Sequence, residues 1–494
     1  MHFFRLRPGL LRHGKLLLGV GAGAAISLNS MGLTNEPEAS FFQKGFSKEL
    51  SHRSFGDLAR GLFVYEICSR AWLVKTSISA MSLCDTLHLS FLYAPFCRRT
   101  FYRHFCGGET PAALIQNMQS LQASGIAPCL NSSREIDLPS DIDPRQFVST
   151  ANTVPDNIKV PAPPVQQEMQ NIAQEAFDSY LYSIDLASKV ENSTCAIKLT
   201  PFINPLVLFR FNAILNNSAN QPAAKFTEML NDNPSFSSYE QDELRRFWSF
   251  SEKLCEYAQK KGVLLFIDAE QTYFQDTIHS ISLDLMKKFN QQEAIVHNTY
   301  QLYLKKTKGI LNEHMKQSAL ENWLMGAKIV RGAYINSEPR HLIHDRKEDT
   351  DRDYNAAMES LFLGASRAAP GNKGASQIPS KSRQGKWGIM IATHNKSSVC
   401  KVLDLLEKKK IDTSKTSLYI AQLLGMSDDI TYALTDYPRG EIPEFHVAKY
   451  VSWGPIYQVL PYLVRRAREN IGALERSTEE RTYYRQEMRK RLHI

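Results

Sequence analysis

The residues best suited to bind a small acid are two adjacent arginines, Arg465 and Arg466, in the stretch PYLVRRAREN at 461–470. We expect this stretch to be helical. A guanidinium group pairs with a carboxylate through two parallel hydrogen bonds, so two such groups side by side would hold one small carboxylate firmly. Glu469 follows Arg465 by four residues and would orient it from the same helix face. A run of Arg and Glu on a helix is more often a solvated surface, so a site here requires support from residues elsewhere.

That support comes from polar residues in and after short apolar segments upstream. In chain order they are Lys198, Asp268, Thr299, Gln301, Lys328, Arg331, Gly332, Ala333, Tyr334, Thr393, His394, Gln422, Lys449 and Tyr450. A buried lysine or arginine destabilises a protein unless an anion pairs with it, so Lys198, Lys328 and Arg331 require anionic partners. Asp268 and a phosphate-bearing cofactor are both candidates. Asp268, Glu270 and His394 also suit a divalent cation, but so many positive charges disfavour one, and we assign no metal.

Eight short apolar segments separated by longer helical stretches must position these side chains. They lie at 126–130, 196–200, 263–268, 294–299, 327–332, 389–393, 418–424 and 446–451. Continuous apolar strands alternating with helices are typical of a parallel sheet covered on both faces. Eight strands without a GxGxxG turn after the first favour the α/β class and a (βα)8 TIM-type barrel over a doubly wound sheet.

The 494 residues divide into three predicted parts: a leader at 1–35, a helical arm at 36–110 and the barrel at 111–494. Thr110 and Pro111 have the residue types that begin a helix. Two polar insertions, at 137–165 and 366–386, interrupt the barrel, and the second is expected to be a disordered surface loop. The aromatic residues of the arm and its arginines at 98, 99 and 103 fit either ordinary packing with a basic rim or contact with a membrane or partner.

The leader contains four basic residues and no acidic residue before Glu36, a pattern typical of a mitochondrial presequence, with a secretory signal as the alternative. Its apolar run is too short to span a bilayer, which needs about 20 residues. Eight scattered cysteines without a CxxC pair indicate reduced thiols. A net charge of +8 without an aromatic-basic RNA motif or a zinc-finger pattern gives no reason to expect nucleic-acid binding.

The motifs KLT, FIDAEQTY, NTYQLYL, KIVRGAY, IATHN, QLLGM and YLVRRAREN occur in this order, with barrel spacing. In combination they resemble the proline dehydrogenases, mitochondrial flavoenzymes also called proline oxidases. The resemblance implies a barrel that holds FAD noncovalently at the carboxyl ends of its strands, with the helix of Arg465 over the mouth. It implies oxidation of L-proline to Δ1-pyrroline-5-carboxylate, with hydride passing from C5 to flavin N5. It also implies electron transfer to quinone, and thus peripheral contact with the matrix side of the mitochondrial inner membrane.

The resemblance also implies individual roles. Arg465, Arg466 and Lys198 would bind the substrate carboxylate, Glu469 would orient the arginines, and Glu135 would pair with them and close the site. The residues expected to wall the proline ring or brace Lys198 are Asp268, Tyr450, Leu423 and Tyr334. The flavin would be bound by Thr299, Gln301, Lys328, Arg331, Gly332, Ala333, Thr393 and His394.

Other functions stay open at this point. A hydroxyproline dehydrogenase is the nearest alternative, and Tyr450 is the residue to examine for a partner to the substrate's extra hydroxyl. A folate-linked flavin reductase or a metal-dependent lyase would use a similar barrel, although the arginine pair disfavours both. An inactive mitochondrial scaffold is disfavoured because the whole set of motifs is present.

Overall fold

The computed structural model describes residues 38–87, 89–132, 163–217, 226–230, 234–367, 385–408, 415–438, 444–472 and 474–493. The predicted leader at 1–35 lies outside these ranges, as do Glu135 and most of both predicted insertions. All eight cysteines lie inside them and are free thiols, as predicted. A search of the described helices finds none that is both long enough and apolar enough to cross a membrane.

Eight parallel strands close into a barrel in which each strand pairs with the next along the chain and β8 pairs with β1. The prediction of a (βα)8 barrel is therefore confirmed. The strands are β1 (Ile126–Asn131), β2 (Thr194–Ile197), β3 (Leu264–Ile267), β4 (Val296–Gln301), β5 (Gly326–Val330), β6 (Trp387–Ala392), β7 (Thr416–Leu423) and β8 (His446–Ser452).

Helices cover the outside of the barrel because each crossover between parallel strands must return along the sheet. They are α8 (Pro163–Ala187), α9 (Pro205–Asn217), α10 (Phe226–Leu230), α11 (Ser238–Lys261), α12 (Thr272–Phe289), α13 (Thr307–Glu321), α14 (Lys347–Arg367), α15 (Lys396–Glu407) and α16 (Asp428–Thr435). Short 3-10 turns are η4 (Thr200–Phe202) and η5 (Arg340–Leu342). The predicted cap is present before α6 (Pro111–Ala123), where Thr110 accepts a hydrogen bond from the Ala113 N–H at 3.3 Å.

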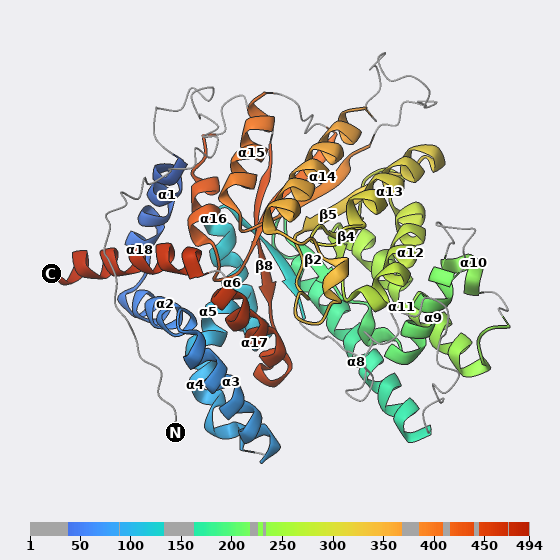
Figure 1. Ribbon diagram of the computed structural model, residues 1–494, viewed down its shortest axis with the longest axis horizontal. Coiled ribbons are helices and arrows are strands. Elements are labelled where there is room, and N and C mark those ends of the chain that lie inside the picture. The colour runs from blue at the N-terminus through green and yellow to red at the C-terminus, as the bar shows by residue number, and fades with distance from the viewer. Residues whose placement is uncertain are drawn as a thin grey trace, which may run out of the picture.

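An arm of short helices precedes the barrel. It consists of α1 (Glu38–His52), α2 (Phe55–Cys68), α3 (Ala71–Thr86), η2 (Ser90–Leu92), α4 (Ala94–Cys97), a π-helical turn η3 (Arg98–Tyr102) and α5 (Arg103–Phe105). Figure 1 shows α1 and α2 on the same side of the molecule as α18 (Leu474–Leu492), while α3 and α4 lie beside α17 (Ile456–Gly472). The arm thus contacts both C-terminal helices.

The pleat of the strands decides which side chains enter the barrel, because successive residues point to opposite faces. Small and aromatic residues fill the interior, including Ala448 of β8 and Phe266 of β3, whose ring stacks on His297 at 4.2 Å. Tyr450 packs against the same interior cluster. The register of β8 thus aims Tyr450 inward and Lys449 outward, toward the helices.

Candidate active site

Asp268 is the anion at the centre of the barrel's carboxyl end. Directly after β3, it accepts a hydrogen bond from Lys328 Nζ at 2.7 Å on one oxygen and from Tyr450 Oη at 2.7 Å on the other. Lys328 also lies 4.9 Å from the centre of the Tyr450 ring. Three strands that do not pair with one another, β3, β5 and β8, therefore contribute to one buried acid–base cluster inside the barrel. Asp268 is the partner that the sequence suggested for a buried cation.

Electrostatics keep this carboxylate ionised. Burial alone raises the pKa of Asp268, but the positive charges of Lys328 and Lys198 outweigh it, so the pKa lies below its ordinary value. Burial, followed by the charge of Asp268, raises the pKa of Tyr450 well above its ordinary value. Tyr450 therefore remains a protonated hydrogen-bond donor at neutral pH.

Lys198 links β2 to the loop after β5. Its Nζ donates a hydrogen bond to Tyr334 Oη at 2.9 Å, and its backbone N–H donates to Tyr180 Oη at 3.0 Å. The guanidinium carbon of Arg465, on α17, lies 5.8 Å from the centre of the Tyr334 ring. Tyr334 thus contacts two cations that lie far apart in the sequence, one after β2 and one in α17, as a ring with a negative face can.

Both arginines of the pair turn away from solvent. Arg465 is partly buried, and Arg466 is 5% exposed with its guanidinium carbon 5.0 Å from the centre of the Tyr462 ring. Tyr462 belongs to an apolar cluster against which Leu423, at the end of β7, also packs. The side chain of Glu469 and the whole of Glu135 lie outside the described residues, so their predicted roles stay predictions.

A second polar group lies at the ends of β5 and β6. Arg331 Nε donates to Asp351 at 2.7 Å, while its two terminal nitrogens donate to Thr393 Oγ1 at 2.7 Å and Ser398 Oγ at 3.0 Å. The ring of Tyr354 lies 4.3 Å from the guanidinium carbon. These contacts fix the planar group in one orientation.

Gln301 and His394 are also held in place. Gln301 donates from its amide to the Glu270 carbonyl at 2.8 Å and accepts weakly from the Ala333 N–H at 3.4 Å. His394 Nδ1 lies 2.9 Å from Ser427 Oγ. Every described residue of the predicted cofactor set therefore lies at the carboxyl ends of β4, β5 or β6, or directly after them.

Two features at these ends fit a bound flavin. Thr299 is 2% exposed, yet its hydroxyl has no hydrogen-bond partner among the described residues, which is unfavourable unless a ligand supplies one. Gly332 has φ +151° and is exposed, and a Cβ there would stand 2.1 Å from the Tyr303 ring. Only glycine fits beside Tyr303 here, and the backbone at this position is exposed at the carboxyl end of the barrel, where a flat ligand could approach it.

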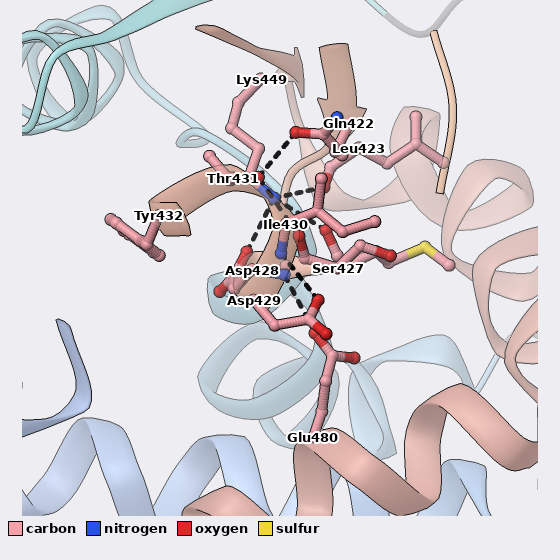
Figure 2. A network of polar contacts seen from close by, with 12 residues as sticks. Gln422, Leu423, Ser427, Asp428, Asp429, Ile430, Thr431, Tyr432, Lys449 and Glu480 are labelled. Atoms are coloured by element: carbon pink, nitrogen blue, oxygen red, sulfur yellow. Dashed lines mark hydrogen bonds and ion pairs between the residues drawn. The ribbon is translucent and has the colours of Figure 1, made fainter. Parts of the chain in front are cut away.

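Lys449 corrects one expectation. The sequence grouped it with the polar residues at the strand ends, but its side chain lies outside the barrel. Figure 2 shows its side chain reaching the turn that begins α16, where Nζ donates to Asp428 Oδ1 and to the Met426 carbonyl, both at 2.7 Å. Asp428 also accepts from Arg53, the residue directly after α1, at 2.9 Å. Lys449 therefore links β8 to α16, and Asp428 extends this link to the arm.

Sequence reasoning assigned no supporting role to several residues that hold the site together, although it counted Glu270 among the polar residues after the third strand. Glu270, fully buried, accepts from the backbone N–H groups of Leu199 and Thr200, each at 3.2 Å, and thereby fixes the loop after Lys198. Its place in the motif FIDAEQTY was the only available signal. Asp351 and Ser398, which hold Arg331, lie on α14 and α15 and gave no local signal.

Comparisons with known proteins agree with this geometry. Residues 164–479 match the family described as proline dehydrogenase. The chain is 54% identical to the probable mitochondrial proline dehydrogenase of Schizosaccharomyces pombe, over the whole of both chains. It is 27% identical to the mitochondrial proline dehydrogenase 1 of Dictyostelium discoideum, over 90% of this chain and 74% of that protein. Proline utilization A from Bdellovibrio bacteriovorus shares the fold, with a TM-score of 0.51 and 14% identity over 88% of this chain and 37% of that one.

Proposed function

The chain belongs to the proline dehydrogenase family of enzymes, and we propose that it oxidises L-proline to Δ1-pyrroline-5-carboxylate with a noncovalently bound FAD. The relatives named above as mitochondrial support a mitochondrial location, and we place the protein on the matrix side of the inner membrane. Its electrons would pass to a membrane quinone. The observation that carries the proposal is the chain of contacts from Lys198 through Tyr334 to Arg465.

Proline has one carboxylate on a small apolar ring, and the carboxylate is the only group able to fix its orientation strongly. In the proposal, Arg465 and Arg466 bind it with Lys198 as a third cation, and Glu135 and Glu469 hold the arginines. Tyr334, Tyr450, Leu423 and Asp268 shape the space for the ring. Orientation of this kind can lower a barrier by several kcal/mol.

Asp268 neutralises Lys328 inside the barrel and orients the Tyr450 hydroxyl. We propose that this leaves the charges of Lys198 and the arginines available to the substrate. The cofactor would be held by Thr299, Gln301, Lys328, Arg331, Gly332, Ala333, Thr393 and His394. Bound FAD would supply the hydride acceptor, because the chemistry of a cofactor enzyme belongs to the cofactor.

The absorption spectrum of the purified protein tests the function. We expect flavin bands that are bleached when L-proline is added without oxygen. A colourless protein, or bands that proline leaves unchanged, would contradict the proposal.

The cofactor site has its own test in Thr299→Val. Valine keeps the shape but cannot hydrogen-bond, so we expect flavin to dissociate roughly tenfold more readily. The matched control is Thr416→Val, because Thr416 lies at the opposite end of the barrel and has a similarly buried hydroxyl without a partner in the described part of the chain. Equal flavin affinity in both variants would remove Thr299 from the site.

A further inference from the structure

The arm exposes an unusual concentration of large apolar side chains. Of the fifteen that are exposed in the described part of the chain, eight fall between positions 55 and 96. These eight are Phe55, Phe63, Trp72, Leu83, Leu87, Phe91, Leu92 and Phe96. Soluble proteins seldom leave so many large apolar side chains together in water, so such a patch usually marks an interaction surface.

Among the described residues, this face of the arm has no packing partner. Along α3 only Val74 is buried among the side chains described, whereas Trp72 is 67% and Leu83 is 60% exposed. The rings of Phe63 and Phe96 meet edge to face at 6.0 Å, which joins α2 to α4 at the surface. Figure 1 shows α3 and α4 projecting from the barrel.

The charge around the patch is positive. Residues 70–103 contain five basic side chains, those at 70, 75, 98, 99 and 103, and one acidic side chain, Asp85. All five basic residues are exposed. Arg70, Arg98 and Arg103 pair with Glu66, Glu109 and Asp57, so Lys75 and Arg99 are the two whose charge no described acidic residue neutralises. Exposed aromatic and aliphatic side chains bordered by arginine and lysine are the combination that binds an anionic lipid surface.

We propose that the exposed face of α3, η2 and α4 docks on an anionic lipid bilayer. Trp72, Leu83, Phe91, Leu92 and Phe96 form its apolar centre, and the basic residues form its rim. The surface deepens the proposed function, on which it rests, because an enzyme that reduces a membrane quinone must reach the membrane. Contact is peripheral, since none of the described helices can span a bilayer.

A second copy of the chain fits this face less well. A symmetric pair buries the same patch against itself, so it would bring two basic rims together. Repulsion between them would oppose association, whereas anionic lipid headgroups attract each lysine or arginine by about 1 kcal/mol. The bilayer is therefore the occupant that the charge favours.

Docking would place α17, the helix that carries Arg465 and Arg466, next to the lipid surface. α3 contacts α17, and Met81 and Tyr93 of the arm pack against the cluster that contains Tyr462 and Leu463. Arg465 and Arg466 follow directly in α17. The bilayer and the proposed proline site would thus lie on opposite sides of one helix.

Cosedimentation of the purified full chain with lipid vesicles tests this surface and needs neither proline nor an electron acceptor. The variant carries Trp72→Ser, Phe91→Ser and Phe96→Ser, and the matched control carries Val165→Ser, Leu320→Ser and Leu363→Ser at comparably exposed positions of α8, α13 and α14. A second variant carries Lys75→Gln and Arg99→Gln. Vesicles of phosphatidylcholine alone are compared with vesicles that also contain cardiolipin.

We expect the arm variant to bind cardiolipin vesicles on the order of a hundredfold more weakly, while the control binds like the parent. Each charge replacement should weaken cardiolipin binding roughly fivefold and leave binding to neutral vesicles unchanged. Proline-dependent reduction of a soluble dye should be the same in all variants, which also shows that they fold.

Parent-like vesicle binding by the arm variant would overturn the proposal. The proposal would also be overturned if the parent is a dimer in solution without vesicles and the arm variant is a monomer. Absence of dye reduction in the parent would instead contradict the proposed function and leave the vesicle result intact.

Discussion

Arg465 lies over the ring of Tyr334, with its guanidinium carbon 5.8 Å from the ring centre. The contact joins α17 to the loop after β5, and the Tyr334 hydroxyl continues it to Lys198, which follows β2. Two cations that would repel each other thus share one aromatic ring, at 5.6 Å and 5.8 Å from its centre. A carboxylate placed between them would relieve the repulsion that remains.

Tyr334→Phe removes the hydroxyl that orients Lys198 and keeps the ring under Arg465. We expect KM for proline to rise roughly tenfold, because a hydrogen bond to a charged group is lost, while flavin content stays unchanged. Steady-state kinetics and the flavin-to-protein ratio measure both. Tyr437→Phe is the control, since its hydroxyl donates to Glu407 away from the barrel mouth. An unchanged KM would mean that Lys198 needs no support from Tyr334.

Asp268→Asn leaves Lys328 buried without its counter-charge. Breaking a buried pair typically costs about 3–5 kcal/mol, so we expect a clearly lower free energy of unfolding in urea, together with loss of activity. The control is Asp345→Asn, whose partner Lys305 lies at 3.3 Å in a largely exposed pair and should contribute less than about 1 kcal/mol. Equal losses in the two variants would show that Asp268 is not the anchor of the cluster.

Glu480 gives the protein a pH-dependent stability. Burial, together with the neighbouring charges of Asp429 and Asp428, raises its pKa from 4.5 to about 8. The folded protein therefore keeps a proton that the unfolded chain releases, and this contribution to stability is lost as pH rises toward 8. Glu480→Gln mimics the protonated acid. Its free energy of unfolding should therefore exceed that of the parent by a margin that grows by up to about 1.4 kcal/mol per pH unit between about pH 5 and 8. Thermal unfolding across that range measures the gap.

Glu479→Gln serves as the control for that titration, because Glu479 is exposed and pairs with Lys396 at 2.6 Å. Its difference from the parent should not widen with pH in the same range. A gap between Glu480→Gln and the parent that stays constant with pH would contradict the raised pKa.

The sequence predicted the barrel well because its signals are local. Apolar runs bounded by polar residues located all eight strands, and Thr110 with Pro111 marked the start of α6. The carboxyl ends of the strands could also be assigned to the same end of the barrel. The sequence therefore predicted that Asp268, Lys328 and Tyr450 lie near one another. Their mutual contacts follow from the alternation of side chains along parallel strands.

The features that the sequence did not predict depend on long-range packing or on which face of a strand a side chain points to. Asp351 reaches Arg331 from a helix twenty positions later, and Tyr180 reaches the Lys198 backbone from α8. Lys449 was placed at the site because it adjoins Tyr450, but neighbouring strand residues face opposite sides, and Asp428 holds it outside the barrel. For the arm, the sequence showed only that aromatic and basic residues are present, not that the apolar side chains are exposed.

The central claim is that Arg465 and Arg466 bind the substrate by its carboxylate. Its most direct test compares L-proline with pyrrolidine, which lacks that group, in the parent enzyme and in Arg465→Met. We expect the substitution to lower kcat/KM for proline about a hundredfold or more, to change that for pyrrolidine little, and to leave flavin bound. Equal losses on both substrates, or loss of the flavin itself, would contradict the claim.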